Sequence, residues 1–73
     1  MERLTEEQQV VLQAIINYID ENAYSPSVRE LCEMTGKKSP ATIEHHLKNL
    51  KEKGYISYKE QKSRTIRVLK ENE

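Results

Sequence analysis

The chain has 73 residues, which suffices for one domain with a thin core and leaves little room for an enclosed active site. It is 36% apolar and 33% charged, has no apolar run near the roughly 20 residues of a membrane span, and begins with a polar, acidic segment unlike a signal peptide. The single cysteine excludes an internal disulfide, so we expect a protein of the reducing cytoplasm.

The charges balance overall but are divided unevenly along the chain. Residues 1–35 hold two basic and seven acidic residues, whereas residues 36–73 hold ten basic and five acidic residues. A surplus of positive charge confined to one half is typical of a protein that keeps one face for a polyanion. The second half is therefore where a nucleic-acid-binding surface is expected.

The first expected element is a helix over residues 5–22. Thr5 and Gln8 form a capping-box pattern, in which each side chain accepts the other residue's backbone N–H. An apolar stripe recurs at helical spacing and comprises Val11, Leu12, Ile15, Ile16 and Ile19. The alternative is that this stripe binds a partner protein. A core role is favoured because so short a chain has few other apolar side chains to bury.

A second, shorter helix is expected over residues 27–35, followed by a tight turn. Ser27 and Glu30 repeat the capping-box pattern. The inward-facing positions would be Val28, Leu31 and Cys32. A lone thiol at such a position is either a redox sensor or a small apolar filler, and the filler role is favoured. Gly36 permits the left-handed conformation with which the chain leaves the helix, and the turn continues through Lys37 and Lys38.

The third expected helix, over residues 39–53, has end signals on both sides. The Ser39 hydroxyl is suited to cap it, Pro40 fits its first position, and Gly54 ends it. Its apolar stripe is Ile43, Leu47 and Leu50. The opposite side gathers small, polar and basic residues, including Ala41, Thr42, Glu44, His45 and Lys48. A helix that enters a DNA major groove needs such a side, although the same pattern fits a solvated amphipathic helix.

The order of short helix, glycine turn and helix is the helix-turn-helix arrangement, in which the second helix of the pair enters the major groove. After Gly54 the apolar period changes to two, which predicts strands over residues 55–59 and 64–69 joined by a polar, basic link. The expected fold class is mainly α with a small β-hairpin over residues 55–69, a three-helix winged helix-turn-helix.

Catalytic and cofactor signals are weak in this sequence. His45 and His46 are adjacent, so on a helix they point about 100° apart and cannot chelate one ion from one side. The chain has two glycines, too few for a glycine-rich phosphate loop, and no serine has a base and an orienting group near it in sequence. We therefore expect no metal, no cofactor and no catalysis.

Four segments together resemble a known family: LTEEQQVVLQAI, SPSVREL, SPATIEHHLKNLKEKGYI and SRTIRVL. Over residues 4–69 they are similar to the N-terminal DNA-binding domain of LexA, the repressor family of the bacterial SOS response to DNA damage. The resemblance implies a winged helix-turn-helix whose third helix reads a half-site in the major groove. It also implies that two copies bind a palindromic operator on double-stranded DNA.

The resemblance and the basic side chains together give an expected set of contacts. The residues expected to face the bases are Ser39, Ala41, Thr42, Glu44 and His45. The residues expected on the DNA backbone are Lys37, Lys38, Lys48, Gln61, Lys62, Ser63 and Arg64. The family's second domain carries a Ser–Lys self-cleavage site and most of the dimer interface. The 73 residues do not contain it, so we expect no enzyme and a monomer in the absence of DNA.

Two features depart from the family pattern. Family members often have glycine in the wing, whereas the tip here is Gln61-Lys62-Ser63-Arg64, which leaves the turn type open. Thr42 and His45 vary the reading positions, which leaves the operator sequence open. Two other functions compete: a winged-helix module that binds protein through its acidic first helix, and a small stand-alone regulator unrelated to the SOS response. The charge division favours DNA over a protein partner.

Overall fold

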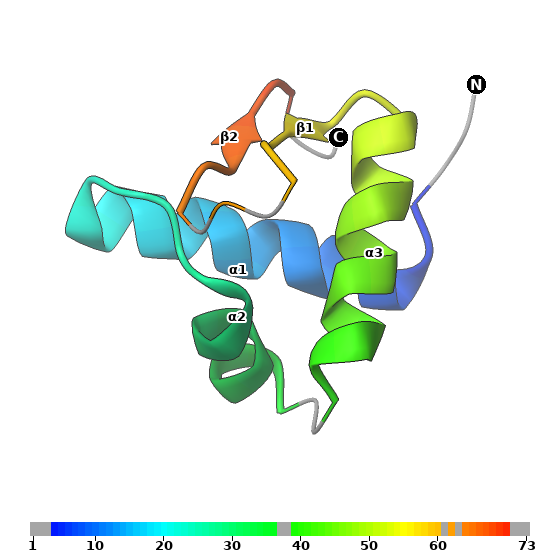
Figure 1. Cartoon of the computed structure of the whole chain (residues 1–73), viewed down its shortest axis with the longest axis horizontal. Helices are drawn as coiled ribbons and strands as arrows, with labels where there is room; N and C mark the ends of the chain where they lie inside the picture. The colour runs from blue at the N-terminus through cyan, green and yellow to red at the C-terminus, as the bar shows by residue number, and fades with distance from the viewer. Residues whose placement is uncertain (1–3, 37–38, 61, 63, 71–73) are drawn as a thin grey trace.

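Three helices and a small β-hairpin follow one another along the chain, which confirms the predicted winged helix-turn-helix class (Figure 1). The computed structural model describes residues 4–36, 39–60, 62 and 64–70. The elements are α1 (Glu6–Asn22), α2 (Val28–Thr35), α3 (Pro40–Glu52), β1 (Ile56–Ser57) and β2 (Arg67–Val68). The strands pair antiparallel, with Ile56 opposite Val68 and Ser57 opposite Arg67.

The first two helices begin with the capping boxes that the sequence predicts. At α1, the hydroxyl of Thr5 accepts the N–H of Gln8 at 3.1 Å, and the N–H of Thr5 donates to Oε1 of Gln8 at 3.0 Å. At α2, Ser27 and Glu30 make the same two bonds, at 3.2 and 2.8 Å. Because free N–H groups at a helix start need partners, these boxes fix where α1 and α2 begin.

The start of α3 differs from the prediction, although Pro40 does occupy its first turn. The hydroxyl of Ser39 makes no capping hydrogen bond among the described residues. The carbonyl oxygen of Ser39 accepts the N–H of Thr42 at 3.1 Å instead, so the amide that the hydroxyl would have capped is already taken. The predicted Ser39 side-chain cap is therefore wrong, and the hydroxyl is exposed to solvent.

The end of α3 is set by Gly54, as predicted, through a Schellman motif. Gly54 has φ +84°, a conformation that residues with a Cβ rarely adopt. Its N–H donates to the carbonyl oxygen of Lys51, and the N–H of Tyr55 donates to the carbonyl oxygen of Leu50, both at 3.0 Å. The motif turns the chain sharply out of α3 and into the hairpin.

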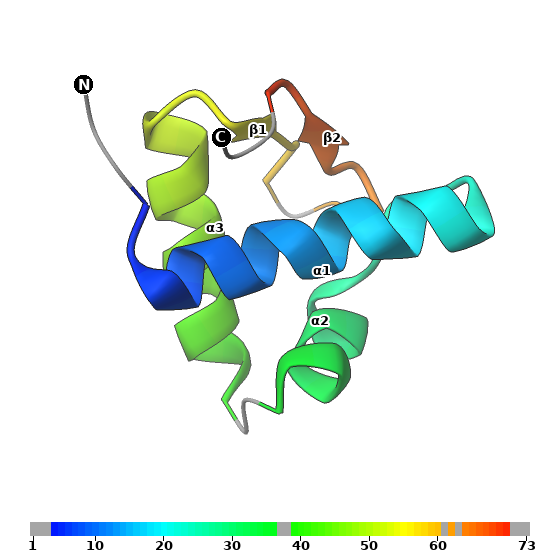
Figure 2. The same cartoon turned by 180° about the vertical axis from the view of Figure 1, so that it is seen from behind.

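One hydrophobic core lies between the helices and the hairpin, where α1 crosses α3 and packs beside α2 (Figure 2). Its buried apolar members are Leu4, Val11, Leu12, Ile15, Leu31, Ile43, Leu47, Leu50, Ile56 and Ile66. Ile16 and Ile19 are partly buried at its edge. The apolar stripe of α1 is therefore core and does not form a partner-binding face. No helix in the described part of the chain is long and apolar enough to span a membrane.

The hairpin, residues 55–69, is called the wing below, and its paired strands are shorter than predicted. Arg64 has φ +58°, a left-handed conformation that interrupts the extended chain before β2 begins. The N–H of Lys59 donates to the hydroxyl of Thr65 at 2.9 Å and not to a backbone carbonyl of the opposite strand, and the N–H of Ile66 donates to Oγ of Ser25 at 3.1 Å. Much of the wing is therefore fixed by side chains of other elements and not by a β-ladder.

Candidate nucleic-acid interface

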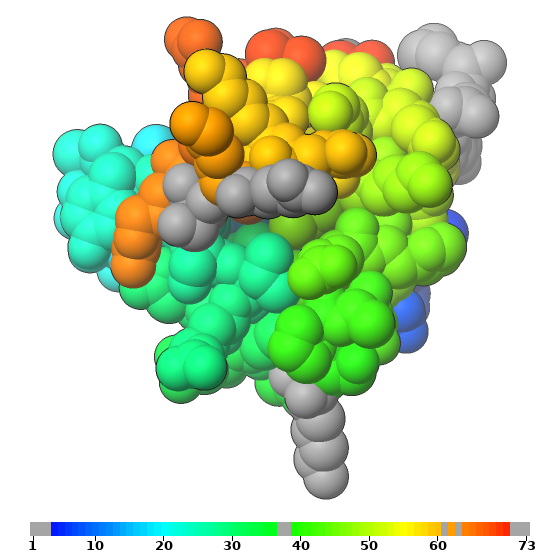
Figure 3. Space-filling model, in the orientation of Figure 1, coloured from blue at the N-terminus to red at the C-terminus, as the bar shows by residue number. Residues whose placement is uncertain are grey.

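The face of the molecule opposite α1 is formed by α2, α3 and the wing (Figure 3). Between them lies an open groove of about 780 Å³, and residues of both helices and of the wing line it. Because α1 packs on the other side of α2 and α3, it leaves the outer side of α3 uncovered. This face is the candidate interface.

The outer side of α3 presents small and polar groups to solvent. All five predicted base-facing residues are exposed, namely Ser39, Ala41, Thr42, Glu44 and His45. Ala41, Glu44 and His45 line the groove, and Nε2 of His45 lies 3.3 Å from Nδ2 of Asn49, one turn along the helix. The structure thus brings a small side chain, a carboxylate and an imidazole together at one edge of the groove.

Basic side chains border the groove on all three elements. Lys48 of α3 and Lys62 of the wing, both predicted backbone contacts, are exposed and line the groove. Arg29 of α2 and Lys59 of the wing line it as well, although the sequence analysis did not single them out. Arg29 is one of two basic residues in the otherwise acidic positions 1–35, and this could have identified it from the sequence as a candidate DNA contact. The remaining predicted contacts Lys37, Lys38, Gln61 and Ser63 lie outside the described residues.

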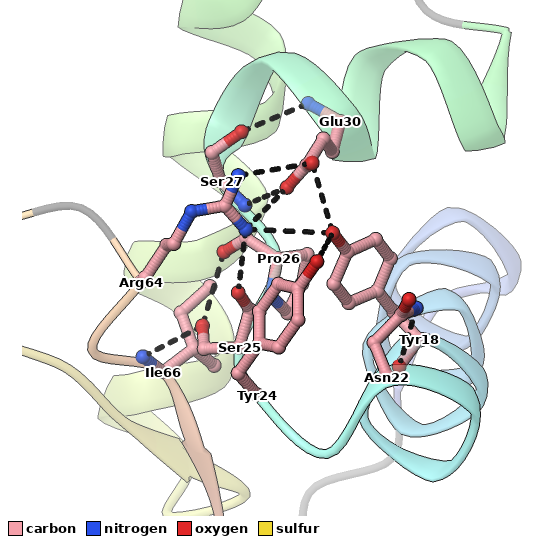
Figure 4. A network of polar contacts seen from close by, with 9 residues as sticks. All are labelled: Tyr18, Asn22, Tyr24, Ser25, Pro26, Ser27, Glu30, Arg64 and Ile66. Atoms are coloured by element: carbon pink, nitrogen blue, oxygen red, sulfur yellow. Dashed lines mark hydrogen bonds and ion pairs between the residues drawn. The ribbon is translucent and has the colours of Figure 1, made fainter.

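Arg64, a predicted backbone contact, also lines the groove, and its guanidinium lies against the start of α2 (Figure 4). Nη1 donates to Oε1 of Glu30 at 2.9 Å, and Nη2 donates to Oε2 of Glu30 at 3.1 Å. Nη1 also lies 3.2 Å from the carbonyl oxygen of Ser25 and 3.4 Å from the hydroxyl of Tyr18. The guanidinium carbon is 5.1 Å from the ring centroid of Tyr24. A carboxylate fixed by a capping box is a matched partner for the planar guanidinium.

Tyr18, Tyr24, Ser25, Glu30 and Arg64 form one network, called the Arg64 cluster below (Figure 4). The hydroxyl of Tyr18 donates to Oε2 of Glu30 at 2.8 Å, and the Tyr18 and Tyr24 rings meet edge to face with centroids 5.5 Å apart. The hydrogen bonds from Arg64, and then from the Ser27 N–H, lower the pKa of Glu30 to about 2. The Glu30 carboxylate in turn raises the pKa of Arg64. Both groups are therefore charged at neutral pH.

The opposite edge of the wing is attached to α3. Nζ of Lys51 donates to the carbonyl oxygen of Tyr58 at 3.3 Å and lies 4.6 Å from the centroid of the Tyr58 ring. Burial raises the pKa of the Tyr58 hydroxyl, and the carboxylates of Glu60 and Glu44 add to the effect. The wing is thus attached to the α1–α2 connection through Ser25, to α2 through Glu30, and to α3 through Lys51.

The two adjacent histidines have different surroundings. His45 is exposed on the groove side, whereas His46 is buried with Nε2 3.2 Å from Oε2 of Glu7 on α1. Within the described residues, no group of three or more histidine, cysteine, aspartate or glutamate side chains is placed to hold a metal ion. Cys32 is a free thiol, partly buried against the core.

The sequence matches known proteins over nearly its whole length. The model of the family described as "LexA DNA binding domain" matches residues 1–65. The "LexA repressor" of Desulfatibacillum aliphaticivorans is 51% identical over 70 residues, which cover 96% of this chain and 34% of that protein. The "Transcription regulator LexA" of Synechocystis sp. is 38% identical over 69 residues, which cover 94% of this chain and 34% of that protein.

These relatives extend well beyond the matched region, since this chain spans about one third of their length. The match includes α1 together with α2, α3 and most of the wing, and the last three are the elements that line the groove. On its sequence match and on its fold, the chain belongs to the LexA DNA-binding domain family.

Proposed function

We propose that this chain binds double-stranded DNA sequence-specifically as the DNA-binding part of a LexA-like transcriptional repressor that acts in the SOS response. The observation that supports this most is the exposed outer side of α3 beside a groove bordered by Arg29, Lys48, Lys59 and Lys62. A helix of this kind fits the major groove, and flanking cations neutralise phosphates. The names of the relatives support the repressor role.

The proposed base contacts and phosphate contacts are assigned from the chemistry and the position of each side chain. Ala41 is small enough for close approach to base edges, His45 can donate to guanine N7 or O6, and Glu44 can accept from cytosine N4. Ser39 and Thr42, nearer the start of α3, complete the base-facing set. Lys48 and Lys62 would contact phosphates, which hold the domain on the duplex without reading sequence.

Two copies are proposed to bind one palindromic operator. The described fold measures 30 × 25 × 22 Å, whereas helix-turn-helix half-sites on one side of the duplex lie about 34–36 Å apart. One copy therefore covers one half-site. The apolar stripes of α1 and α3 are occupied in the core, which leaves little for a dimer interface and favours a monomer in the absence of DNA.

The experiment is a selection of bound sequences from a random duplex pool, followed by titration of the enriched duplex and of a scrambled duplex. We expect one enriched motif containing inverted half-sites, tighter binding to that motif than to its scramble, and a monomer by sedimentation without DNA. Recovery of no common motif, with equal affinity for both duplexes, would overturn the proposal of sequence-specific binding.

A further inference from the structure

The wing has little β-structure with which to fix its own position. Its ladder consists of two residue pairs, and a two-stranded hairpin is at best marginally stable alone. Within the loop, the N–H of Lys59 donates to the hydroxyl of Thr65 at 2.9 Å, which closes the loop but does not join it to the helices. Contacts with other elements must therefore set the position of the loop that carries Lys62.

Arg64 makes the largest set of such contacts in the described part of the wing. It forms a two-point ion pair with Glu30, donates to the carbonyl oxygen of Ser25, and lies over the ring of Tyr24. All these partners belong to the end of α1, its connection to α2, and the first turn of α2 (Figure 4). Glu30 is itself held by its capping box with Ser27, so it offers a fixed acceptor.

The backbone of Arg64 supports the same conclusion. Its φ of +58° lies in the left-handed region, where a non-glycine residue persists only when its surroundings hold it. A side chain that reached freely for a phosphate would supply no such constraint. The Arg64 cluster supplies it, because it fixes the guanidinium at Nη1 and Nη2 and over one face.

We propose that Arg64 is a positioning residue for DNA binding: through its ion pair with Glu30 it holds the wing, and with it Lys62, beside α3, and it does not itself contact a phosphate. The proposal rests on the DNA-binding function proposed above. It assigns Glu30 a favourable role in binding a polyanion, although Glu30 is itself negatively charged.

The test uses the fact that a positioning role and a direct phosphate contact predict opposite effects on DNA affinity when the charge of Glu30 is removed. Glu30→Gln removes the charge but keeps a capping box, because glutamine serves at that position as well as glutamate. If Arg64 acts through Glu30, Glu30→Gln weakens duplex binding about two- to fivefold, the factor that corresponds to an exposed ion pair. If Arg64 contacts phosphate directly, Glu30→Gln frees Arg64, removes a negative charge and tightens binding. Tighter binding would overturn the proposal.

Arg64→Gln and the double variant complete the cycle. We expect Arg64→Gln to weaken binding by the same factor as Glu30→Gln, and the double variant to bind no worse than either single variant. Glu33→Gln and Arg67→Gln are matched controls, since they change the same charges at exposed positions of α2 and β2. If Arg64→Gln weakens duplex binding as much in the Glu30→Gln variant as it does in the wild type, the proposal is overturned.

A second readout does not depend on DNA. Amide resonances of the wing are compared between the free wild-type chain and its variants by NMR. We expect Glu30→Gln, which lies outside the wing, to shift the same wing amides as Arg64→Gln, including Lys62 and Thr65, while the α2 control Glu33→Gln leaves them in place. Wing amides that Glu30→Gln does not move would overturn the positioning role. If the wild type binds no duplex, the proposed function fails, yet this readout still decides the role of Arg64.

Discussion

The N–H of Ile66 donates to Oγ of Ser25 at 3.1 Å, and both residues are buried. This bond joins the start of β2 to the connection between α1 and α2, across 41 positions of sequence. In the register of the two strands this N–H points away from the opposite strand, so the wing depends on a side chain of another element to satisfy it.

Ser25→Ala should therefore destabilise the fold. The change leaves the buried N–H of Ile66 without its acceptor, at a cost of about 1–3 kcal/mol in the free energy of unfolding. Urea unfolding followed by circular dichroism measures it. Ser39→Ala is the control, because the exposed Ser39 hydroxyl makes no capping bond in the described structure, and should change stability by less than about 0.5 kcal/mol. Equal effects of the two variants would contradict the Ser25 assignment.

Ala23→Gly should stabilise the fold. Ala23 ends α1 with φ +65°, a left-handed conformation. This conformation costs a residue with a Cβ about 1 kcal/mol or more, and glycine avoids that cost. Part of the gain is lost because glycine has greater conformational freedom in the unfolded chain. We expect a net gain of up to about 1 kcal/mol, measured as a rise in the thermal midpoint. Ala14→Gly, inside α1, should instead lower stability by about 1 kcal/mol. A fall in the midpoint for Ala23→Gly would contradict the observed cap conformation.

The stability that Glu30 contributes should depend on pH. The pKa of Glu30 is lowered to about 2 in the folded chain, below the value of about 4.3 for an unperturbed glutamate. Its contribution is therefore fully present above about pH 5 and is lost as pH falls through about 2. The stability difference between the wild type and Glu30→Gln should shrink across this window. A difference for Glu30→Gln that stays flat between about pH 5 and pH 2 would argue against the ion pair.

Lys62 should contribute to DNA binding by charge alone. Lys62→Ala should weaken binding to preferred and scrambled duplexes alike and flatten the salt dependence by about one unit of slope. Combining it with Arg64→Gln should flatten the slope by about one unit in total and not two, because Arg64 acts by holding Lys62 in place. Lys70→Ala, which removes an exposed charge outside the groove lining, is the control. A slope reduced by about two units in the double variant would contradict this account.

Local signals in the sequence predict the helices well and the wing only in part. The capping boxes at Thr5 and Ser27 and the glycine at position 54 act within a few residues, so they can be recognised without a structure. The ion pair of Glu30 with Arg64 spans 34 positions. No periodicity indicates a contact over that separation, so the sequence did not predict this ion pair.

The predicted length of the strands failed for the same reason. Alternating apolar residues do indicate extended chain, and Ile56 and Ile66 are buried as that pattern requires. Pairing, however, is decided by what competes for each backbone N–H. The hydroxyl of Thr65 takes the N–H of Lys59, which would face the opposite strand if the ladder continued. The left-handed Arg64 beside it is held by partners on other elements, which nothing in the local sequence of the wing indicates.

The measurement that tests the central claim most directly is a titration of His45→Ala and Lys48→Ala against the preferred and the scrambled duplex at one salt concentration. His45 lies on the exposed side of α3 and lines the groove, one turn beyond Ala41. If α3 reads bases there, His45→Ala loses about 1–3 kcal/mol on the preferred duplex and almost nothing on the scramble, while Lys48→Ala weakens both alike. Equal losses on both duplexes for His45→Ala, or no loss on either, would contradict base reading by this side of α3.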